Sequence, residues 1–452
     1  MHDENTPTAN ESIAKIPTWT HLLKFSLPTI MSILIMSTFG IVDGIFVSRL
    51  IDPNALAPVS IVFPFLGFVM AIGFMLGVGG NALIAKKIGE GKAQEAKENF
   101  SLITLISFLL ATSIAAIGII FPDFILSILG TDEYIHQMAL SYMLPLLYFL
   151  PLIVLGMVFQ QFLITAGKAH YSAITAFLGG STSAGLNFLF IYVMDMGLQG
   201  AAFATSIGYS LSAIVGLTFF IFNRKGSLHF VRPRLDLHAL GRTCINGASE
   251  MVTMISISIT SILMNNILLD LEGHEAVAAA GIMFAGMGIF SSLFIGYASG
   301  VMPIISYNFG KNDTDNLKKV YVNSLRLIGV ISVISVVLAV LSVDVLISIY
   351  DVPIDTPIHN MARTGFLFIA ASFILMSFNA FSSMFFTALN NGIVSSVLSF
   401  FRTLIFISIA FLTLPHFFGL YGVWAAIPTA EVLGIIMTIF FFWKMKKVYK
   451  YA

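Results

Sequence analysis

The chain has 452 residues, of which 57% are hydrophobic and only 10% are charged. Soluble domains carry about a quarter charged residues, so this composition excludes a protein that water surrounds on all sides. The balance of 23 basic and 23 acidic residues excludes a generally basic nucleic-acid binder, and the single cysteine, Cys244, excludes an intramolecular disulfide framework and a cysteine-rich metal site.

Long apolar runs follow one another along the chain, and a bilayer core of about 30 Å needs about 20 such residues per helix. The runs that meet this length fall at 22–48, 55–84, 99–120, 137–163, 169–193, 199–222, 243–269, 277–307, 320–343, 360–387, 393–414 and 420–443. We therefore expect an all-α integral membrane protein with twelve transmembrane helices. The strands of a β-barrel would be short and alternating. The first run is long enough to remain as a helix, so no cleaved signal peptide is expected.

Basic residues gather in alternate loops, which predicts the orientation of the helices. These residues are Lys86, Lys87, Lys92, Lys97, Lys168, Arg224, Lys225, Arg232, Arg234, Arg242, Lys311, Lys318, Lys319, Lys444, Lys446, Lys447 and Lys450. The opposite loops hold Arg49 and otherwise acids, namely Asp123, Asp132, Glu133, Asp270, Glu272, Glu275, Asp351 and Asp355. Basic loops stay in the cytoplasm, so an even number of helices predicts that both termini are cytoplasmic.

The two halves of the chain repeat at a shift of about 221 residues. Gly79 then matches Gly300, and the turn Gly197–Gly200 matches Gly419–Gly422. We expect two pseudo-symmetric six-helix lobes with a cleft between them, an arrangement that allows alternating access when the lobes rock against each other. The alternative interpretation is a duplicated scaffold that has no role in transport. Because one chain supplies both lobes of the cleft, a monomer would suffice for transport. The predicted parts are a cytoplasmic leader 1–21, an N-lobe 22–222, a linker 223–242, a C-lobe 243–443 and a basic tail 444–452.

Several short motifs occur in a characteristic order: Phe25–Pro28, Gly40–Asp43, Ile84–Gly91, Gly197–Ala202 and Asn246–Met251. Together with the repeat, they make residues 20–445 resemble the multidrug and toxic compound extrusion (MATE) family, in its MepA-like, DinF-related branch. The resemblance implies secondary active efflux from a bacterial inner membrane. The expected substrates are lipophilic, mostly cationic drugs, exported in exchange for H⁺ or Na⁺.

In this family an N-lobe acidic site couples export to ion entry. Asp43 matches the helix 1 aspartate and Thr205 a helix 6 threonine. Helix 5 often supplies Asn and Asp four residues apart, where this chain has Ser183 and Asn187, so the second carboxylate is missing. The resemblance implies that these four residues couple the ion, with Asp43, Asn187 and Thr205 as Na⁺ ligands if sodium is used. A single carboxylate favours H⁺.

Helix geometry supports this site independently. At a rise of 1.5 Å per residue, Asp43, Asn187 and Thr205 would lie at one depth, about 10 Å from the outer surface. A buried ionisable group in a membrane is costly and usually functional, and oxygen ligands suit hard cations. The alternatives are an Asp43 that reaches the outer interface and ordinary interhelical hydrogen bonds for its neighbours.

Other polar residues lie within the predicted spans. Glu250 is either a carboxylate of the cleft or part of a cytoplasmic gate. Gln160, Gln161 and Asn265 are candidates for the cleft, with interhelical hydrogen bonding as the alternative. Arg402 and Glu431 should share a depth and form an ion pair, which either locks the C-lobe or switches when substrate binds.

No catalytic or nucleotide-binding pattern appears in the sequence, so neither an enzyme nor a cofactor is expected, and transport should be driven by an ion gradient. The main alternative is a flippase for lipid-linked saccharides of the same fold superfamily. Such a cavity needs membrane-embedded Arg or Lys to bind pyrophosphate. Arg326, Arg363 and Arg402 are the only arginines within the predicted spans, whereas the acids Asp43, Glu250 and Glu431 favour a cationic substrate.

Overall fold

The computed structural model describes residues 13–51, 56–129, 131, 133–224, 226–350, 352–354 and 356–452. Within these residues there are helices and no strands, and twelve helical segments are long and apolar enough to cross a membrane. The first six spans are α2 (Trp19–Leu50), α3 (Leu56–Gly89), α4 (Ala93–Ile120), α6 (Glu133–Thr165), α7 (Ala169–Asn187) with the π-helical turn η2 (Phe188–Val193), and α8 (Gly197–Phe222).

The other six spans are α9 (Leu237–Glu272), α10 (His274–Gly310), α11 (Thr314–Ser348), α12 (Pro357–Ala388), α13 (Gly392–Phe400) continued by the π-helical turn η3 (Phe401–Phe406) and α14 (Ile407–Phe418), and α15 (Leu420–Tyr449). The prediction of twelve transmembrane helices is confirmed. The chain is a multi-pass membrane protein. A short extra helix, α5 (Pro122–Ile128), lies between α4 and α6.

Several helices extend about six residues beyond the predicted runs, at the starts of α4, α9 and α11 and at the end of α15. The α9 helix starts at Leu237, because the Asp236 carboxylate caps it by accepting a hydrogen bond from Ala239 N at 2.9 Å. The α15 helix continues to Tyr449, inside the segment predicted as a tail. Predictions for 1–12, Asp132, Lys225, Asp351 and Asp355, and for the side chains of Arg49 and Glu133, lie outside the described residues.

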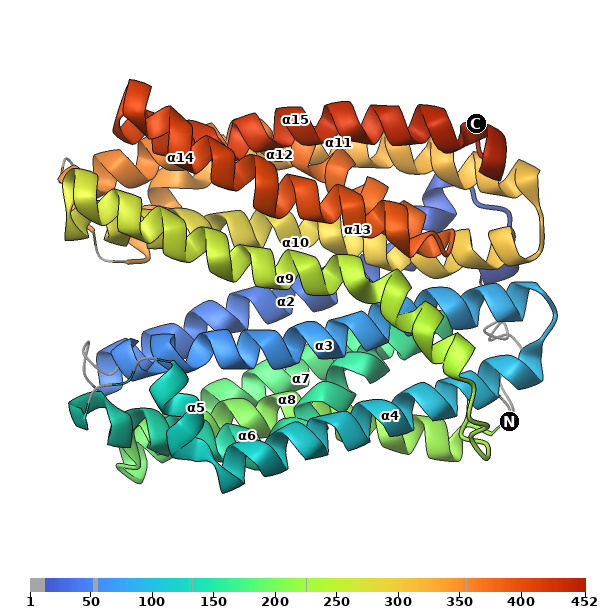
Figure 1. Ribbon diagram of the computed structural model, residues 1–452, viewed down its shortest axis with the longest axis horizontal. Coiled ribbons are helices and arrows are strands. Elements are labelled where there is room, and N and C mark those ends of the chain that lie inside the picture. The colour runs from blue at the N-terminus through green and yellow to red at the C-terminus, as the bar shows by residue number, and fades with distance from the viewer. Residues whose placement is uncertain are drawn as a thin grey trace.

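The spans form two bundles, with α2–α8 in one and α9–α15 in the other, and the start of α2 lies at the same end as the end of α15 (Figure 1). We call this the termini end. The bundles meet where α2 and α3 pack against α9 and α10.

Glycines close the interface between the bundles at the termini end. A Cβ atom on Gly79 would overlap the Thr243 carbonyl of α9, and one on Gly300 would lie 2.8 Å from Ser26 Cα of α2. These two glycines are equivalent under the 221-residue repeat. A Cβ atom on Gly89 would likewise overlap the Tyr307 carbonyl, and one on Gly310 would overlap the Lys86 carbonyl. These two contacts are also equivalent under the repeat. Only glycine lets the backbones approach so closely. We call Gly79, Gly89, Gly300 and Gly310 the glycine seam.

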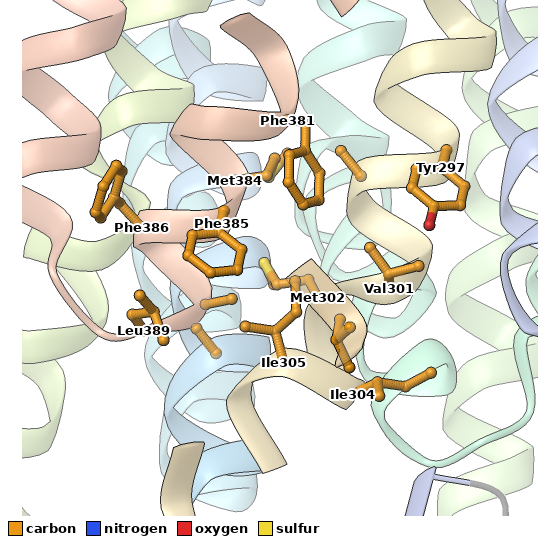
Figure 2. Packing of buried hydrophobic residues seen from close by; sticks show 14 of the residues in the cluster. Tyr297, Val301, Met302, Ile304, Ile305, Phe381, Met384, Phe385, Phe386 and Leu389 are labelled. Atoms are coloured by element: carbon orange, nitrogen blue, oxygen red, sulfur yellow. The ribbon is translucent and has the colours of Figure 1, made fainter. Parts of the chain in front are cut away.

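The largest apolar cluster lies mainly in the C-lobe and continues across the interface to Ile30 of α2 and Val78 of α3. Figure 2 shows Phe381, Phe385 and Met384 of α12 beside Val301 and Met302 of α10. Large apolar side chains also cover the outer surface of this lobe, for example Val337, Leu341, Ile436 and Ile439. An apolar exterior around helices that satisfy their own backbone hydrogen bonds is the arrangement that a bilayer requires.

Candidate functional site

The structure brings Asp43, Ser183, Asn187 and Thr205 together inside the N-lobe. Asn187 Nδ2 donates a hydrogen bond of 2.8 Å to Asp43 Oδ1, and Ser183 Oγ donates to Oδ1 at 3.0 Å and to Oδ2 at 3.3 Å. Thr205 Oγ1 completes the set with a longer contact of 3.4 Å to Oδ2. The carboxylate of α2 is therefore held by neutral donors from α7 and α8.

Close packing of α7 against α8 and α2 brings these side chains within reach. A Cβ on Gly179 would lie 2.6 Å from the Gly208 carbonyl oxygen, and the reverse holds for Gly208. The ring of Phe39 on α2 occupies the space that a side chain on Gly180 would need. Asn187 directly precedes the π-helical turn η2. Such turns are common at functional sites because they redirect the side chains of a helix.

A small cavity adjoins the Asp43 carboxylate. Its volume is about 30 Å³, and its lining includes Gln160, Tyr209, Ser183 and Thr205. A cavity needs about 10–15 Å³ of such space to hold one water molecule. The space therefore suits a hydrated ion or a few waters and is far too small for a drug-sized molecule.

The polar atoms around this cavity fit a small cation. Asn187 Oδ1 is buried and accepts no hydrogen bond from the described residues. With the two Asp43 oxygens and the hydroxyl oxygens of Ser183 and Thr205, it offers the hard oxygen ligands that Na⁺ accepts. The same carboxylate can instead take up a proton. Asp43 is the one carboxylate among the described residues that line this cavity.

A second polar cluster lies in the C-lobe, where Arg402 Nη1 is 3.2 Å from Glu431 Oε1. Both side chains are largely buried, with 14% and 8% of their surface exposed. Asn379 Nδ2 donates to Glu431 Oε2 at 2.7 Å and to the Glu431 carbonyl at 3.0 Å, and Thr438 donates to Asn379 Oδ1 at 2.9 Å. The predicted pair thus joins η3 to α15 and α12.

The remaining sequence candidates fall in different surroundings. Glu250 is partly exposed on α9. Gln160 lines the Asp43 cavity and donates to Ser212 Oγ at 3.2 Å. Gln161 points elsewhere: it is buried between α3 and α6, where Asn81 Nδ2 contacts its Oε1 at 3.4 Å. Asn265 is exposed on α9 and joins neither polar cluster.

Two residues of these clusters were not predicted from the sequence. Tyr209 lines the Asp43 cavity and stands four residues after Thr205, so helical spacing could have indicated it. Asn379 is the side chain that connects Glu431 to Thr438. Its signal was weak, because a single Asn in a transmembrane helix looks like any interhelical hydrogen-bonding residue.

Comparison with known proteins identifies the family. The family model described as MatE matches residues 28–193 and 250–412, which is more than half of the chain. The chain belongs to the MATE family. This MATE transporter is 28% identical over 313 residues to the multidrug export protein MepA of Staphylococcus haemolyticus strain JCSC1435, covering 67% of this chain and 68% of the relative. It is 24% identical over 327 residues to MepA of Staphylococcus aureus strain MRSA252, covering 71% of each.

Solved MATE structures share the whole fold. A crystal structure of MATE in the straight conformation superposes with a TM-score of 0.91 at 20% identity, covering 99% of this chain and 100% of that one. An outward-facing multidrug resistance MATE transporter of the MOP superfamily gives 0.89 at 20% identity, covering 99% and 98%. The predicted all-α fold and the MepA-like resemblance are thus confirmed.

Proposed function

We propose that this MATE transporter is a multidrug efflux antiporter of a bacterial inner membrane. It exports lipophilic, mostly cationic compounds in exchange for H⁺ or Na⁺, uses no cofactor and works as a monomer. The observation that carries this proposal is the Asp43 carboxylate inside the N-lobe, which neutral donors hold at 2.8–3.4 Å beside an ion-sized cavity. A charge placed at such a cost in a membrane segment is best explained by ion coupling.

The proposed cycle alternates access between the two lobes. With both termini in the cytoplasm, as the basic loops favour, the glycine seam closes the cytoplasmic side in this structure. An ion from outside would then reach Asp43, neutralise the carboxylate and change its hydrogen bonds to Ser183 and Asn187. Rocking of the lobes would open the seam, release the ion inward and admit the drug.

The oxygen atoms around Asp43 offer one argument for each coupling ion. The unpartnered Asn187 Oδ1 supports Na⁺, because it adds an oxygen ligand beside the carboxylate. The single carboxylate supports H⁺, because one negative charge binds a desolvated cation weakly and protonation needs no further ligand. We propose H⁺ as the favoured ion, with Na⁺ as the alternative.

Efflux of ethidium from energised vesicles tests this function. The gradient applied is ΔpH alone, Na⁺ alone, or neither. Export that one gradient drives, and that Asp43→Asn abolishes, supports the antiporter and names its ion. Asp195→Asn is the matched control, because Asp195 lies in the turn after η2 with φ 53°, a conformation that Asn tolerates well.

Two outcomes would contradict the proposal. If Asp43→Asn exports dye as well as the unmodified protein does, Asp43 is not the coupling carboxylate. If no dye moves under any gradient but lipid-linked saccharides cross the vesicle membrane, the chain is a flippase.

A further inference from the structure

The C-lobe contains a cavity that the proposed transport cycle does not use. Its volume is about 400 Å³, and it lies between α11, α12 and α15. Its apolar walls include Leu325, Phe378, Ile435 and Ile439. This volume falls in the range of about 300–1,000 Å³ that is common for ligand pockets. The cavity shares no lining residue with the cavity of Asp43.

The cavity faces the lipid phase. Ile439 is 63% exposed and Trp443 is 75% exposed, and both belong to its lining. Trp is enriched where membrane helices meet the headgroup region. A pocket with such a rim is entered from the bilayer, so an acyl chain is the apolar group available to fill it.

The last residues of the chain close the cavity at the termini end. Lys450 adopts a left-handed conformation with φ 53°, which turns the chain back after α15. Tyr451 is fully buried, donates a hydrogen bond of 2.7 Å to the Phe442 carbonyl and packs against Tyr321 and Phe385. Tyr451 therefore closes the cavity near the end of α15, where we expect the lipid headgroups to lie. We call this closed end the floor of the cavity.

Positive charge gathers at this floor. Lys446 lines the cavity and is exposed. Among the described residues, no carboxylate lies within ion-pair distance of it. Lys447, Lys450 and, on α11, Lys318 are exposed within a turn or so of lining residues. Lysine at the membrane surface attracts anionic lipid headgroups.

From these observations we infer that the cavity between α11, α12 and α15 binds an anionic phospholipid of the leaflet at the termini end. One acyl chain lies between Leu325, Phe378 and Ile435, and the phosphate pairs with the ammonium group of Lys446. The apolar cavity and the unpaired lysine at its floor are together complementary to such a lipid. This leaflet is the cytoplasmic one in the proposed orientation, but lipid binding itself does not depend on the transport function.

Native mass spectrometry of the purified full-length protein tests the inference. The probes are palmitoyl-oleoyl-phosphatidylglycerol and phosphatidylcholine with the same chains. We expect phosphatidylglycerol to be retained about fivefold more than phosphatidylcholine, and Lys446→Glu to remove this preference. Lys447→Glu is the matched control, because it makes the same charge change on the same turn at a residue that does not line the cavity, and it should keep the preference.

A second variant separates the cavity from the charge. Ile435→Trp fills the space and should reduce retention of both lipids although Lys446 is intact, while the melting temperature without lipid shows that the variant folds. Soluble glycerol 3-phosphate should not displace the bound lipid. Equal retention of the two lipids, equal effects of Lys446→Glu and Lys447→Glu, or unchanged binding in Ile435→Trp would each overturn the inference.

Discussion

The two lobes use buried carboxylates in opposite ways. In the N-lobe, Asp43 is held by neutral donors, and no described basic side chain pairs with it. In the C-lobe, Glu431 pairs with Arg402 at 3.2 Å and also accepts from Asn379. Both clusters lie at a π-helical turn in the fifth span of their lobe, since Asn187 precedes η2 and Arg402 belongs to η3.

This difference shows how the surroundings of a buried carboxylate determine its role. An ion pair inside a membrane protein has no net charge, so Arg402 and Glu431 can join three helices without needing an ion. An unpaired carboxylate retains its charge and its affinity for a cation. The cavity beside Asp43 gives that cation room, whereas the Glu431 side chain is 8% exposed. The C-lobe cluster is therefore suited to structure and the N-lobe cluster to exchange.

The largest effect should come from breaking the C-lobe pair. Arg402→Met leaves Glu431 buried without its counter-charge and should destabilise the protein by about 3–5 kcal/mol. Thermal melting of the detergent-purified protein measures this loss. The double variant Arg402→Met/Glu431→Gln should recover most of the stability, because the amide carries no charge and still accepts from Asn379. Normal melting of the single variant would show that the pair is not structural.

A smaller effect is expected from separating the N-lobe helices. Gly208→Ala places a methyl group 2.6 Å from the Gly179 carbonyl oxygen, so α7 and α8 must move apart. We expect a cost of about 1–3 kcal/mol in melting experiments. Gradient-driven efflux should also be lost, because the α7 donors Ser183 and Asn187 would move relative to Asp43. Gly241→Ala is the control, because no atom lies within 4 Å of its added methyl group. Full efflux by Gly208→Ala would mean that close packing is not needed for coupling.

Adding a second carboxylate to the Asp43 cluster should strengthen its binding of cations and so increase its difference from the C-lobe ion pair. Asn187→Asp places a second acid 2.8 Å from the position of Asp43 Oδ1. More ligand charge strengthens cation binding, so we expect Asn187→Asp to favour Na⁺ over the H⁺ proposed for the unmodified protein and to make efflux respond to a Na⁺ gradient. Ser181→Asp, on the same helix but outside the lining of the Asp43 cavity, is the comparison. An unchanged Na⁺ dependence would show that Asn187 is not at the ion.

The smallest effect is predicted for Thr205→Val. Its contact with Asp43 is 3.4 Å long, at the limit of a hydrogen bond. The expected change in apparent ion affinity is therefore about twofold, below the roughly 1 kcal/mol of a typical hydrogen bond. The same efflux titration measures it, with Thr218→Val, at an exposed position on α8, as control. A loss of more than tenfold would make Thr205 a ligand of the ion.

The candidate site was predictable to the extent that helical depth could be counted. Asp43, Asn187 and Thr205 were placed at one depth by their distances from the predicted helix ends, and the structure joins them through hydrogen bonds. The rotation of each helix about its own axis, which decides which side chains face a cavity, was not predictable from depth alone. Gln160 and Gln161 are neighbours in sequence, yet one lines the Asp43 cavity and the other is buried against Asn81. A helix turns by about 100° per residue, so packing alone decides which side chain faces a cavity.

By itself, the sequence determined the membrane class, the twelve spans and the twofold repeat, because bilayer thickness sets the length of an apolar helix and a duplication leaves matching glycines and turns. Only the tertiary structure showed that Gly79 and Gly300 close one end of the molecule, that Asn379 completes the Arg402–Glu431 cluster and that Lys446 lines a second cavity. Contacts of this kind join residues far apart in the chain, and they depend on how helices pack, which local patterns do not encode.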